Sequence, residues 1–217
     1  IIRPEILSPF IPAGTELDLW EGKCYISLVG FMFLNTKLLG FKIPGHINFE
    51  EVNLRFYVKC GDKRGVVFIK EIVPKPALTW VANTIYDENY QTLPMSHEWK
   101  NVNENLHVSY RWKMHEKWHE FKVSAKAKAE EVSKGSEAEF ITEHYWGYAK
   151  VGAKRTNEYE VTHPRWSSYP VETCSIDVDF QSVYGDPFGF LNTLEPASVM
   201  LAEGSEITVE QKRSLRI

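Results

Sequence analysis

One stretch of the chain has the residue types and spacing of a metal site, because residues 115–119 follow the pattern H-E-x-x-H. On a helix this pattern binds zinc, since histidines four residues apart share a face and the glutamate activates a zinc-bound water. Apolar and polar residues alternate at 108–112 and again at 121–125, which indicates two strands joined by a turn. We therefore interpret His115 and His119 as parts of a solvated turn and predict no metal site, with a zinc protease as the alternative.

A second group of reactive side chains lies at 142–148, where a carboxylate, an imidazole and two phenols follow one another. Ser136 and Glu139 form a capping box before it, which predicts a helix of about ten residues. Neighbouring residues on a helix diverge by about 100°. Glu143 and His144 would then not face one substrate as an acid–base pair, although each is a candidate site residue alone. The alternative is structural, with core aromatic residues and a solvated or ion-paired Glu143.

The third group lies on a segment that alternates like a strand, from Glu51 to Lys59. If its apolar residues face an outer helix, Asn53 and Arg55 project into the interior of the protein. An unpaired buried arginine is costly, so Arg55 would need a carboxylate such as Glu71 or Glu143, or an anionic ligand held by its guanidinium. If this face is solvent-exposed instead, Asn53 and Arg55 are ordinary surface residues without a functional role.

Other reactive residues and motifs add little. Lys70 precedes Glu71, and we interpret it as an outward strand residue rather than as a nucleophile. The sequence contains no G-x-S-x-G, no Walker loop and no G-x-G-x-x-G, which are the best-known hydrolase, NTPase and dinucleotide motifs. We therefore predict no cofactor.

The elements that must position these groups are mostly strands. The first 20 residues are proline-rich and predict an arm without regular helix. A buried strand is expected at 24–34, a hairpin at 51–60 and 66–73 with a longer loop, and a short helix from Pro76 to Ile85. A second hairpin is expected at 107–129, with further strands at 158–163, 175–184, 198–203 and 206–211 and a weakly ordered tail at 212–217. Many antiparallel strands with two short helices indicate a β-barrel or an α+β domain.

Composition bounds the function classes. The 217 residues fit one domain, and a net charge of −4 without a basic patch argues against a nucleic-acid partner. The longest apolar run, Tyr25 to Leu34, is too short to span a membrane. No signal peptide opens the sequence, and three widely spaced cysteines, Cys24, Cys60 and Cys174, favour a reducing cytoplasm. The oligomeric state stays open.

Four segments together resemble the YqjF-like family of uncharacterised proteins. They are Phe49–Val58, Gly65–Phe68, Glu139–Tyr148 and His163–Pro164, and the likeness extends from about Leu17 to Val209. That family is placed with the acetoacetate decarboxylase-like fold. The resemblance implies a mainly β (α+β) domain, a closed antiparallel β-barrel with a central cavity and two or three short flanking helices.

The decarboxylases themselves are more distantly similar, and one difference is informative. Glu51-Val52 resembles their glutamate–valine pair at the start of a strand. They also carry a lysine, in an aromatic-Pro-Lys-Lys turn after a short helix, that forms a Schiff base with the keto acid. Here the corresponding stretch is 80–95, and its end reads Gln91-Thr92-Leu93-Pro94-Met95 without a lysine. We therefore predict that the chain lacks this decarboxylation mechanism.

These observations lead to one expectation and two alternatives. We expect the barrel interior to bind a small organic acid. Its candidate residues are Arg55 as anion partner, Glu51, Asn53, Glu71 and Glu143 beside it, and His144, Tyr86 and Tyr90 at the mouth. One alternative is an enzyme acting on a keto or carboxylic acid without a Schiff base. The other is a structural or interaction domain whose barrel is filled by its own aromatic residues.

Overall fold

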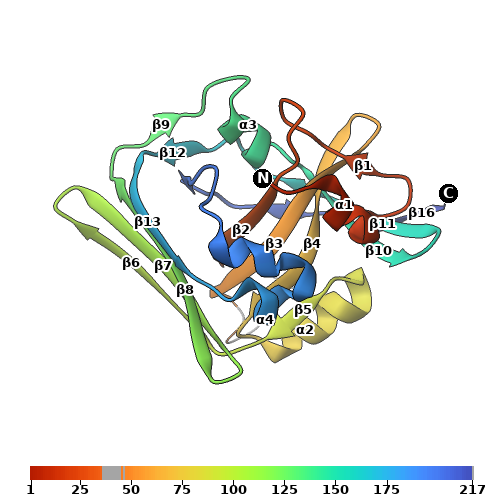
Figure 1. Ribbon diagram of the computed structural model, residues 1–217, viewed down its shortest axis with the longest axis horizontal. Helices are drawn as coiled ribbons and strands as arrows, with labels where there is room; N and C mark the ends of the chain where they lie inside the picture. The colour runs from red at the N-terminus through yellow and green to blue at the C-terminus, as the bar shows by residue number, and fades with distance from the viewer. Residues whose placement is uncertain (36–44, 46, 217) are drawn as a thin grey trace.

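The computed structural model describes residues 1–35, 45 and 47–216, which form mostly β-strands (Figure 1). One large sheet contains β1(Glu16–Leu17), β2(Ile26–Phe33), β3(Phe49–Cys60), β4(Lys63–Val73), β5(Tyr90–Thr92), β10(Trp146–Gly152), β11(Arg155–Thr162), β15(Thr208–Val209) and β16(Arg213–Arg216). A second sheet contains β6(Met95–Val102), β7(Asn105–Met114), β8(Lys117–Lys126) and β13(Val171–Asp177). A small third sheet contains β9(Glu130–Glu131), β12(Ser167–Tyr169) and β14(Leu201–Ala202).

Short helices connect and cover these strands. The α-helices are α1(Pro4–Leu7), α2(Pro76–Val81), α3(Glu137–Thr142) and α4(Phe180–Tyr184). Two 3₁₀-helices, η1(Ser8–Phe10) and η3(Asp186–Thr193), and one short π-helix, η2(Ala82–Tyr86), complete them. Every helix in the described part of the chain falls short of the length or apolarity needed to cross a membrane.

The centre of the large sheet is the hairpin of β3 and β4. The strands pair from Cys60 with Lys63, so the turn is the two residues Gly61 and Asp62, shorter than the predicted loop. β2 pairs with β3 on one side. The edge of β4 away from β3 has two parallel partners, β10 near Gly65 and β5 near Glu71. These two partners therefore occupy opposite ends of β4.

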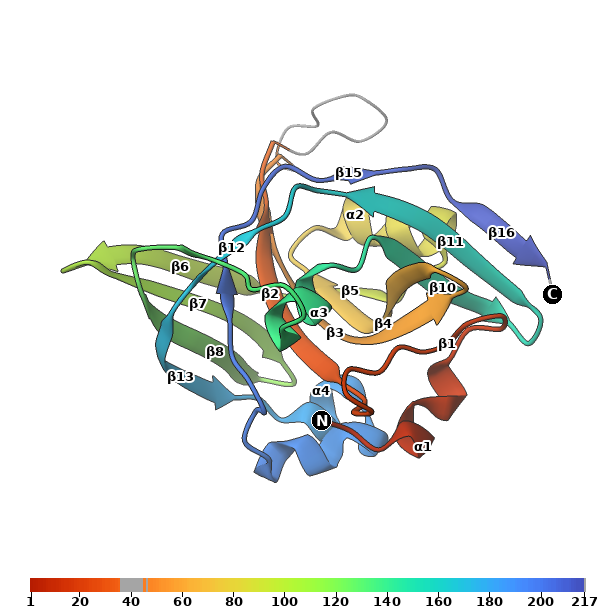
Figure 2. The ribbon, with the colours of Figure 1, turned by 90° about the horizontal axis from the view of Figure 1, so that it is seen from above.

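The predicted closed barrel is wrong, because the strands form open sheets. Figure 2 shows β3, β4, β10 and β11 following one another round a curve while β6, β7, β8 and β13 stand apart. Among the described residues, the outer strands of the large sheet do not pair with one another. Strands β6, β7 and β8 form the separate second sheet together with β13. The sheet is also not purely antiparallel, since β4 has two parallel partners.

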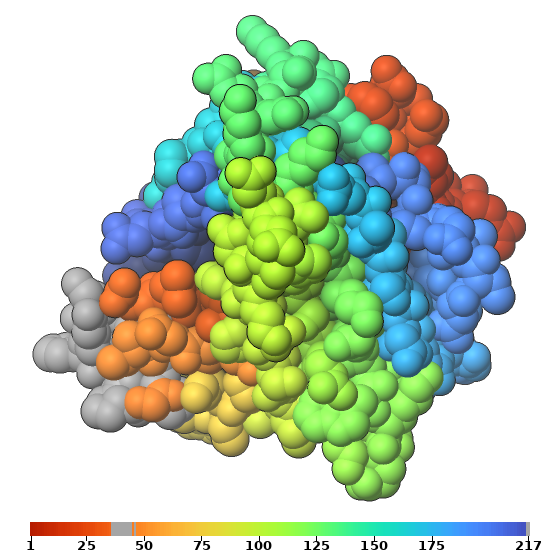
Figure 3. All heavy atoms as spheres, turned by 90° about the vertical axis from the view of Figure 1, so that its left-hand side faces the viewer, coloured from red at the N-terminus to blue at the C-terminus, as the bar shows by residue number. Residues whose placement is uncertain are grey.

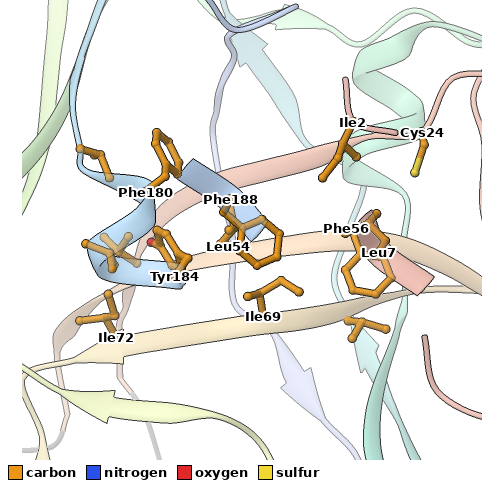
Figure 4. Packing of buried hydrophobic residues seen from close by; sticks show 14 of the residues in the cluster. Ile2, Leu7, Cys24, Leu54, Phe56, Ile69, Ile72, Phe180, Tyr184 and Phe188 are labelled. Carbon is orange, nitrogen blue, oxygen red and sulfur yellow. The ribbon is translucent and has the colours of Figure 1, made fainter. Parts of the chain in front are cut away.

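The apolar core lies on one face of β3 and β4. Leu54 and Phe56 of β3 and Ile69 and Ile72 of β4 pack there against residues of α1, α4 and η3, as Figure 4 shows. The second sheet packs against β2 beside them. A Cβ on Gly30 would lie 2.5 Å from the ring of Phe121, so glycine permits this close approach of the two sheets.

Several predicted elements differ from the observed ones. The arm forms α1 and η1, and its Ile2 and Leu7 enter the core. The helix predicted after Ser136 is six residues long, because the chain from Trp146 onward pairs as β10. The strand expected at 175–184 ends at Asp177 and is followed by α4, and the tail pairs with β11 as β16.

Candidate functional site

The face of β3 opposite the apolar core carries polar residues that are also buried. Glu51 is 1% exposed and Asn53 is 0% exposed. The amide Nδ2 of Asn53 donates to Glu51 Oε1 over 3.0 Å, and Tyr90 Oη donates to Glu51 Oε2 over 3.0 Å. A carboxyl group is therefore held at the base of this face with both oxygens bonded.

A β-bulge in β4 adds a second carboxyl group to this face. Glu71 pairs with Asn53 and is 2% exposed, but the register shifts between Leu54 and Arg55, so that Ile69 has no partner on β3. Side chains alternate along a strand, and one extra residue inverts that alternation. Ile69 and Lys70 both face the apolar core, where Lys70 Nζ donates to the carbonyl of Val183 in α4. The bulge thus places Glu71, rather than Lys70, beside Glu51.

The segment after η2 supplies the third carboxyl group. Asp87 adopts a left-handed conformation (φ 59°) that ends η2 and turns the chain back towards β4. The Glu71 amide donates to the Asn89 carbonyl over 3.0 Å, and the Asn89 side chain donates to the Ile69 carbonyl over 2.6 Å. These bonds fix Glu88 and Tyr90 against the bulged part of β4.

Strand β11 closes the group from the other side. Tyr159 Oη donates to Glu88 Oε1 over 2.9 Å, and Asn157 Nδ2 donates to Asp87 Oδ2 over 2.7 Å. The neighbouring strand makes room for the phenol, because a Cβ on Gly147 would lie 2.2 Å from the Tyr159 ring. We call Glu51, Glu71, Glu88, Tyr90 and Tyr159 the carboxyl cluster.

The electrostatics of the carboxyl cluster favour protonated carboxyl groups. Burial raises the pKa of Glu51 to about 7, although hydrogen bonds from Asn53 and Tyr90 and the charge of Arg55 oppose this shift. Burial also raises the pKa of Glu88 to about 7. The pKa of Glu71 lies well above its ordinary value because of burial and of the charges of Glu88 and Glu51. Carboxyl groups whose pKa lies near neutrality can both release and accept a proton at physiological pH.

Arg55 is the cation next to the carboxyl cluster. It is half-buried on the same face of β3, with its guanidinium carbon 5.8 Å from the centre of the Tyr57 ring. Among the described residues, no carboxylate forms an ion pair with it, and its buried Nε has no hydrogen-bond partner. The guanidinium therefore keeps donors available for an anionic ligand.

Tyr86 lies at the margin of the carboxyl cluster. Its ring meets the Tyr159 ring edge to face, with centroids 5.9 Å apart. Like Tyr90, it is half-buried. The structure thus brings Glu51, Asn53, Glu71 and Tyr90 together, with Tyr86 beside them.

His144 and Glu143 lie after the end of α3, and His144 reaches the polar face of β3 at Tyr57, close enough for the charge of Arg55 to act on it. His144 Nε2 is 3.0 Å from Asp18 Oδ2, which also accepts from Arg64 Nε over 2.6 Å. Tyr145 donates to Glu143 over 2.5 Å. Burial lowers the pKa of His144, so that it is neutral and packs as an aromatic ring beside Tyr57, 4.7 Å between centroids. From the sequence we considered Glu143 as a carboxylate partner of Arg55. In the described structure neither Glu143 nor His144 forms an ion pair with Arg55.

The H-E-x-x-H stretch lies on a hairpin turn as predicted, but its second histidine is not solvated. His115 and Glu116 form the turn, with positive φ angles. His119 is 1% exposed and stacks on Trp112, and its Nδ1 accepts from the Asp179 amide over 3.2 Å. Within the described ranges, no group of three or more histidine, cysteine, aspartate and glutamate residues is arranged to hold a metal ion.

Sequence reasoning missed Glu88 and Tyr159. Glu88 follows a left-handed residue in a connection, where no periodicity indicates its direction. Tyr159 lies on a strand whose burial pattern shows four consecutive buried residues, so alternation could not single it out. The one signal in the sequence that could have pointed to Glu88 was its position between Tyr86 and Tyr90, two residues that were already candidates.

Comparison with known proteins identifies the family. The family model DUF2071, described as an uncharacterised conserved protein, matches residues 1–206. The chain belongs to this family. It is also 39% identical over 64 residues to the uncharacterised protein YqjF of Bacillus subtilis (strain 168), an alignment that covers 29% of this chain and 26% of YqjF. The predicted family is therefore confirmed.

Solved structures of similar shape are acetoacetate decarboxylase-like. An acetoacetate decarboxylase-like enzyme from Sphingomonas wittichii RW1 has a TM-score of 0.61 at 12% identity, covering 98% of this chain and 87% of that one. The enduracididine biosynthesis enzyme MppR with HEPES bound has a TM-score of 0.66 at 12% identity, and the match covers 99% of this chain and 82% of MppR. MppR complexed with pyruvate has a TM-score of 0.60 at 12% identity, covering 98% and 80%. At this identity the likeness shows the fold, which confirms the predicted fold family.

Proposed function

We propose that this protein is an enzyme that binds a small keto acid on the polar face of β3 and moves a proton at the carbon next to its carbonyl group. Glu51 acts as the general base and acid, and Arg55 binds the carboxylate of the substrate. Glu71 and Glu88 exchange protons with Glu51. The observation that carries this proposal is the buried Glu51 carboxyl, with a pKa raised to about 7, beside a guanidinium without a carboxylate partner.

The balance of charges supports this role. Glu51, Glu71 and Glu88 would repel one another if all three were ionised, so the carboxyl cluster retains protons near neutral pH. A bound carboxylate adds one negative charge, which Arg55 compensates. The reaction then needs no change in net charge: the Glu51 carboxylate takes a proton from carbon while a protonated carboxyl group, Glu71 or Glu88, donates one to the carbonyl oxygen, so that an enol forms, and both protons return when the keto acid is restored.

The class of substrate has separate support. MppR, which shares the fold, has been solved with pyruvate. Among the described residues, no lysine forms an ion pair or a side-chain hydrogen bond with Glu51, Glu71 or Glu88. Lys70, the nearest lysine along β4, faces the apolar core. These contacts support proton transfer by carboxyl groups rather than by a Schiff base.

The test follows the methyl protons of pyruvate in D₂O by NMR. At pD near 8 a large share of Glu51 is ionised, and we expect the protein to accelerate exchange of these protons for deuterium. Glu51→Gln keeps the hydrogen-bonding shape of the side chain but cannot take a proton, so it should lose about 10²- to 10⁴-fold of the rate. Glu172→Gln, on the exposed β13, is the matched control and should keep the rate.

Binding is measured separately. Pyruvate should raise the Tm of the wild-type protein and of Glu51→Gln, but not that of Arg55→Gln. Arg55-dependent binding without any exchange would overturn the enzymatic proposal and leave a carboxylate-binding protein. Equal Tm shifts in wild type and Arg55→Gln would remove Arg55 from the site.

A further inference from the structure

Strand β6 is a long strand with one free edge. Among the described residues it exchanges backbone hydrogen bonds only with β7, through eight consecutive pairs from Met95 with Trp112 to Val102 with Asn105. Every residue from Ser96 to Val102 is exposed. Figure 3 shows this strand in yellow-green on the surface, next to β7 and β8 in green and β13 in blue. The backbone groups at this edge are a template for another strand.

The side chains of β6 carry a self-complementary charge pattern. Glu98 and Lys100 lie on one face of the strand, on either side of Trp99, and their charged atoms are 2.6 Å apart. A single lysine at a sheet edge normally discourages pairing with another chain. If β6 pairs in antiparallel fashion with a second copy about Trp99, however, Glu98 of each copy faces Lys100 of the other. The four charges then alternate in sign round a square.

Trp99 lies at the centre of this register. It is 52% exposed, although its indole Nε1 donates to Tyr110 Oη over 3.3 Å. In the same register the two Trp99 side chains meet across the two-fold axis, where an aromatic pair contributes more than its buried area alone. His97 lies on the face of Trp99, and its Nδ1 is 3.3 Å from Glu50 Oε2 of β3, which holds this face of the strand against the domain.

We propose that two copies of this chain associate through β6, in antiparallel register about Trp99, and so join their second sheets into one continuous sheet. The symmetry is that of an isologous dimer, in which each copy offers the same strand. The carboxyl cluster lies in the large sheet, so this association is independent of the proposed reaction.

The test measures molar mass by size-exclusion chromatography with light scattering over a range of protein concentrations. Wild type should reach twice the 25.1 kDa of the chain. Glu98→Lys places four positive charges at the two-fold axis, and Lys100→Glu places four negative charges there. Each single variant should weaken association at least about tenfold, because like charges directly opposite one another repel. The double variant Glu98→Lys/Lys100→Glu restores the alternation and should restore the dimer.

Controls separate this interface from others. Glu172→Lys makes the same change of charge on β13, the opposite edge strand of that sheet, and should remain dimeric. A thermal melt of each variant shows that the domain is folded. A monomeric wild type, a dimer unaffected by either single variant, or a double variant that stays monomeric would each overturn the proposal.

Discussion

The two faces of β3 are both largely buried but differ in chemistry. Leu54 and Phe56 on one face pack into the apolar core. Glu51 and Asn53 on the other face are just as inaccessible, yet they carry a carboxyl group and an amide. Burial of an apolar side chain stabilises a fold, whereas burial of a carboxyl group costs free energy that its hydrogen bonds only partly return.

This difference indicates what each face is for. A chain selected for stability alone would place apolar residues on both faces of a strand buried on both sides. Retaining three carboxyl groups close enough for their charges to act on one another keeps the domain less stable than it could be, a pattern typical of active sites. Substitutions on the two faces should therefore have opposite effects on stability.

The largest expected effect is on the apolar face. Phe56→Ala removes a fully buried ring and leaves a cavity between β3 and α1, so the free energy of unfolding should fall by about 3–5 kcal/mol. The measurement is urea denaturation at pH 5 and pH 8. Because the lost contacts are apolar, the loss should be the same at both pH values. If the alanine variant does not fold, Phe56→Leu gives the same comparison with a smaller loss.

The next largest effect is an increase in the free energy of unfolding, and it is expected for a substitution on the polar face. The pKa of Glu71 is raised above its ordinary 4.5, so the folded protein keeps a proton that the unfolded chain releases. The stability that this proton provides is complete below about pH 4.5 and is lost as pH rises through the folded-state pKa. Glu71→Gln is neutral throughout, so it should gain about 1–3 kcal/mol over wild type at pH 8 and almost nothing at pH 4.

Urea denaturation at several pH values checks this effect, with the exposed Glu172→Gln as the control whose difference from wild type should be small at every pH. A Glu71→Gln variant less stable than wild type at pH 8 would mean that the carboxyl group is ionised and well solvated. The contrast between the faces of β3 would then be lost.

The smallest effect sharpens the role of one hydrogen bond. Tyr90 donates to Glu51 and so favours the ionised carboxylate, which lowers the pKa of Glu51 relative to burial alone. Tyr90→Phe removes that bond and should raise this pKa by about 0.5–1 unit. The pH midpoint of pyruvate exchange should then move to higher pH. Tyr86→Phe, which changes a phenol at the margin of the carboxyl cluster, should leave the midpoint in place.

Much of the architecture followed from local patterns in the sequence. The alternation of Glu51 to Lys59 predicted both the strand and the division of its faces, because side chains alternate strictly along a strand. Pro76 predicted the start of α2, and the positions on either side of His115 predicted a hairpin. Glu51, Asn53, Glu71 and Tyr90 came together because they lie on paired strands.

What failed depended on contacts between distant segments. The helix expected through Tyr148 ends at Thr142, because pairing of Trp146 with Gly65 overrides the local helical pattern. Closure of the barrel depends on how far the outer strands extend, which no local pattern records. Glu88 joins the site through the left-handed Asp87 and through bonds of Asn89 to β4, and none of these has a periodic signal.

The bulge at Ile69 shows that the chemistry of a site can depend on strand register as well as on residue type. If β4 continued from Phe68 in simple alternation, with Ile69 paired to β3, Lys70 would lie on the face of Glu51 and Glu71 would face α4. An amine would then replace a carboxyl group in the site without any substitution, so a one-residue shift in the register of such a strand offers related proteins a route between carboxyl-based and amine-based catalysis.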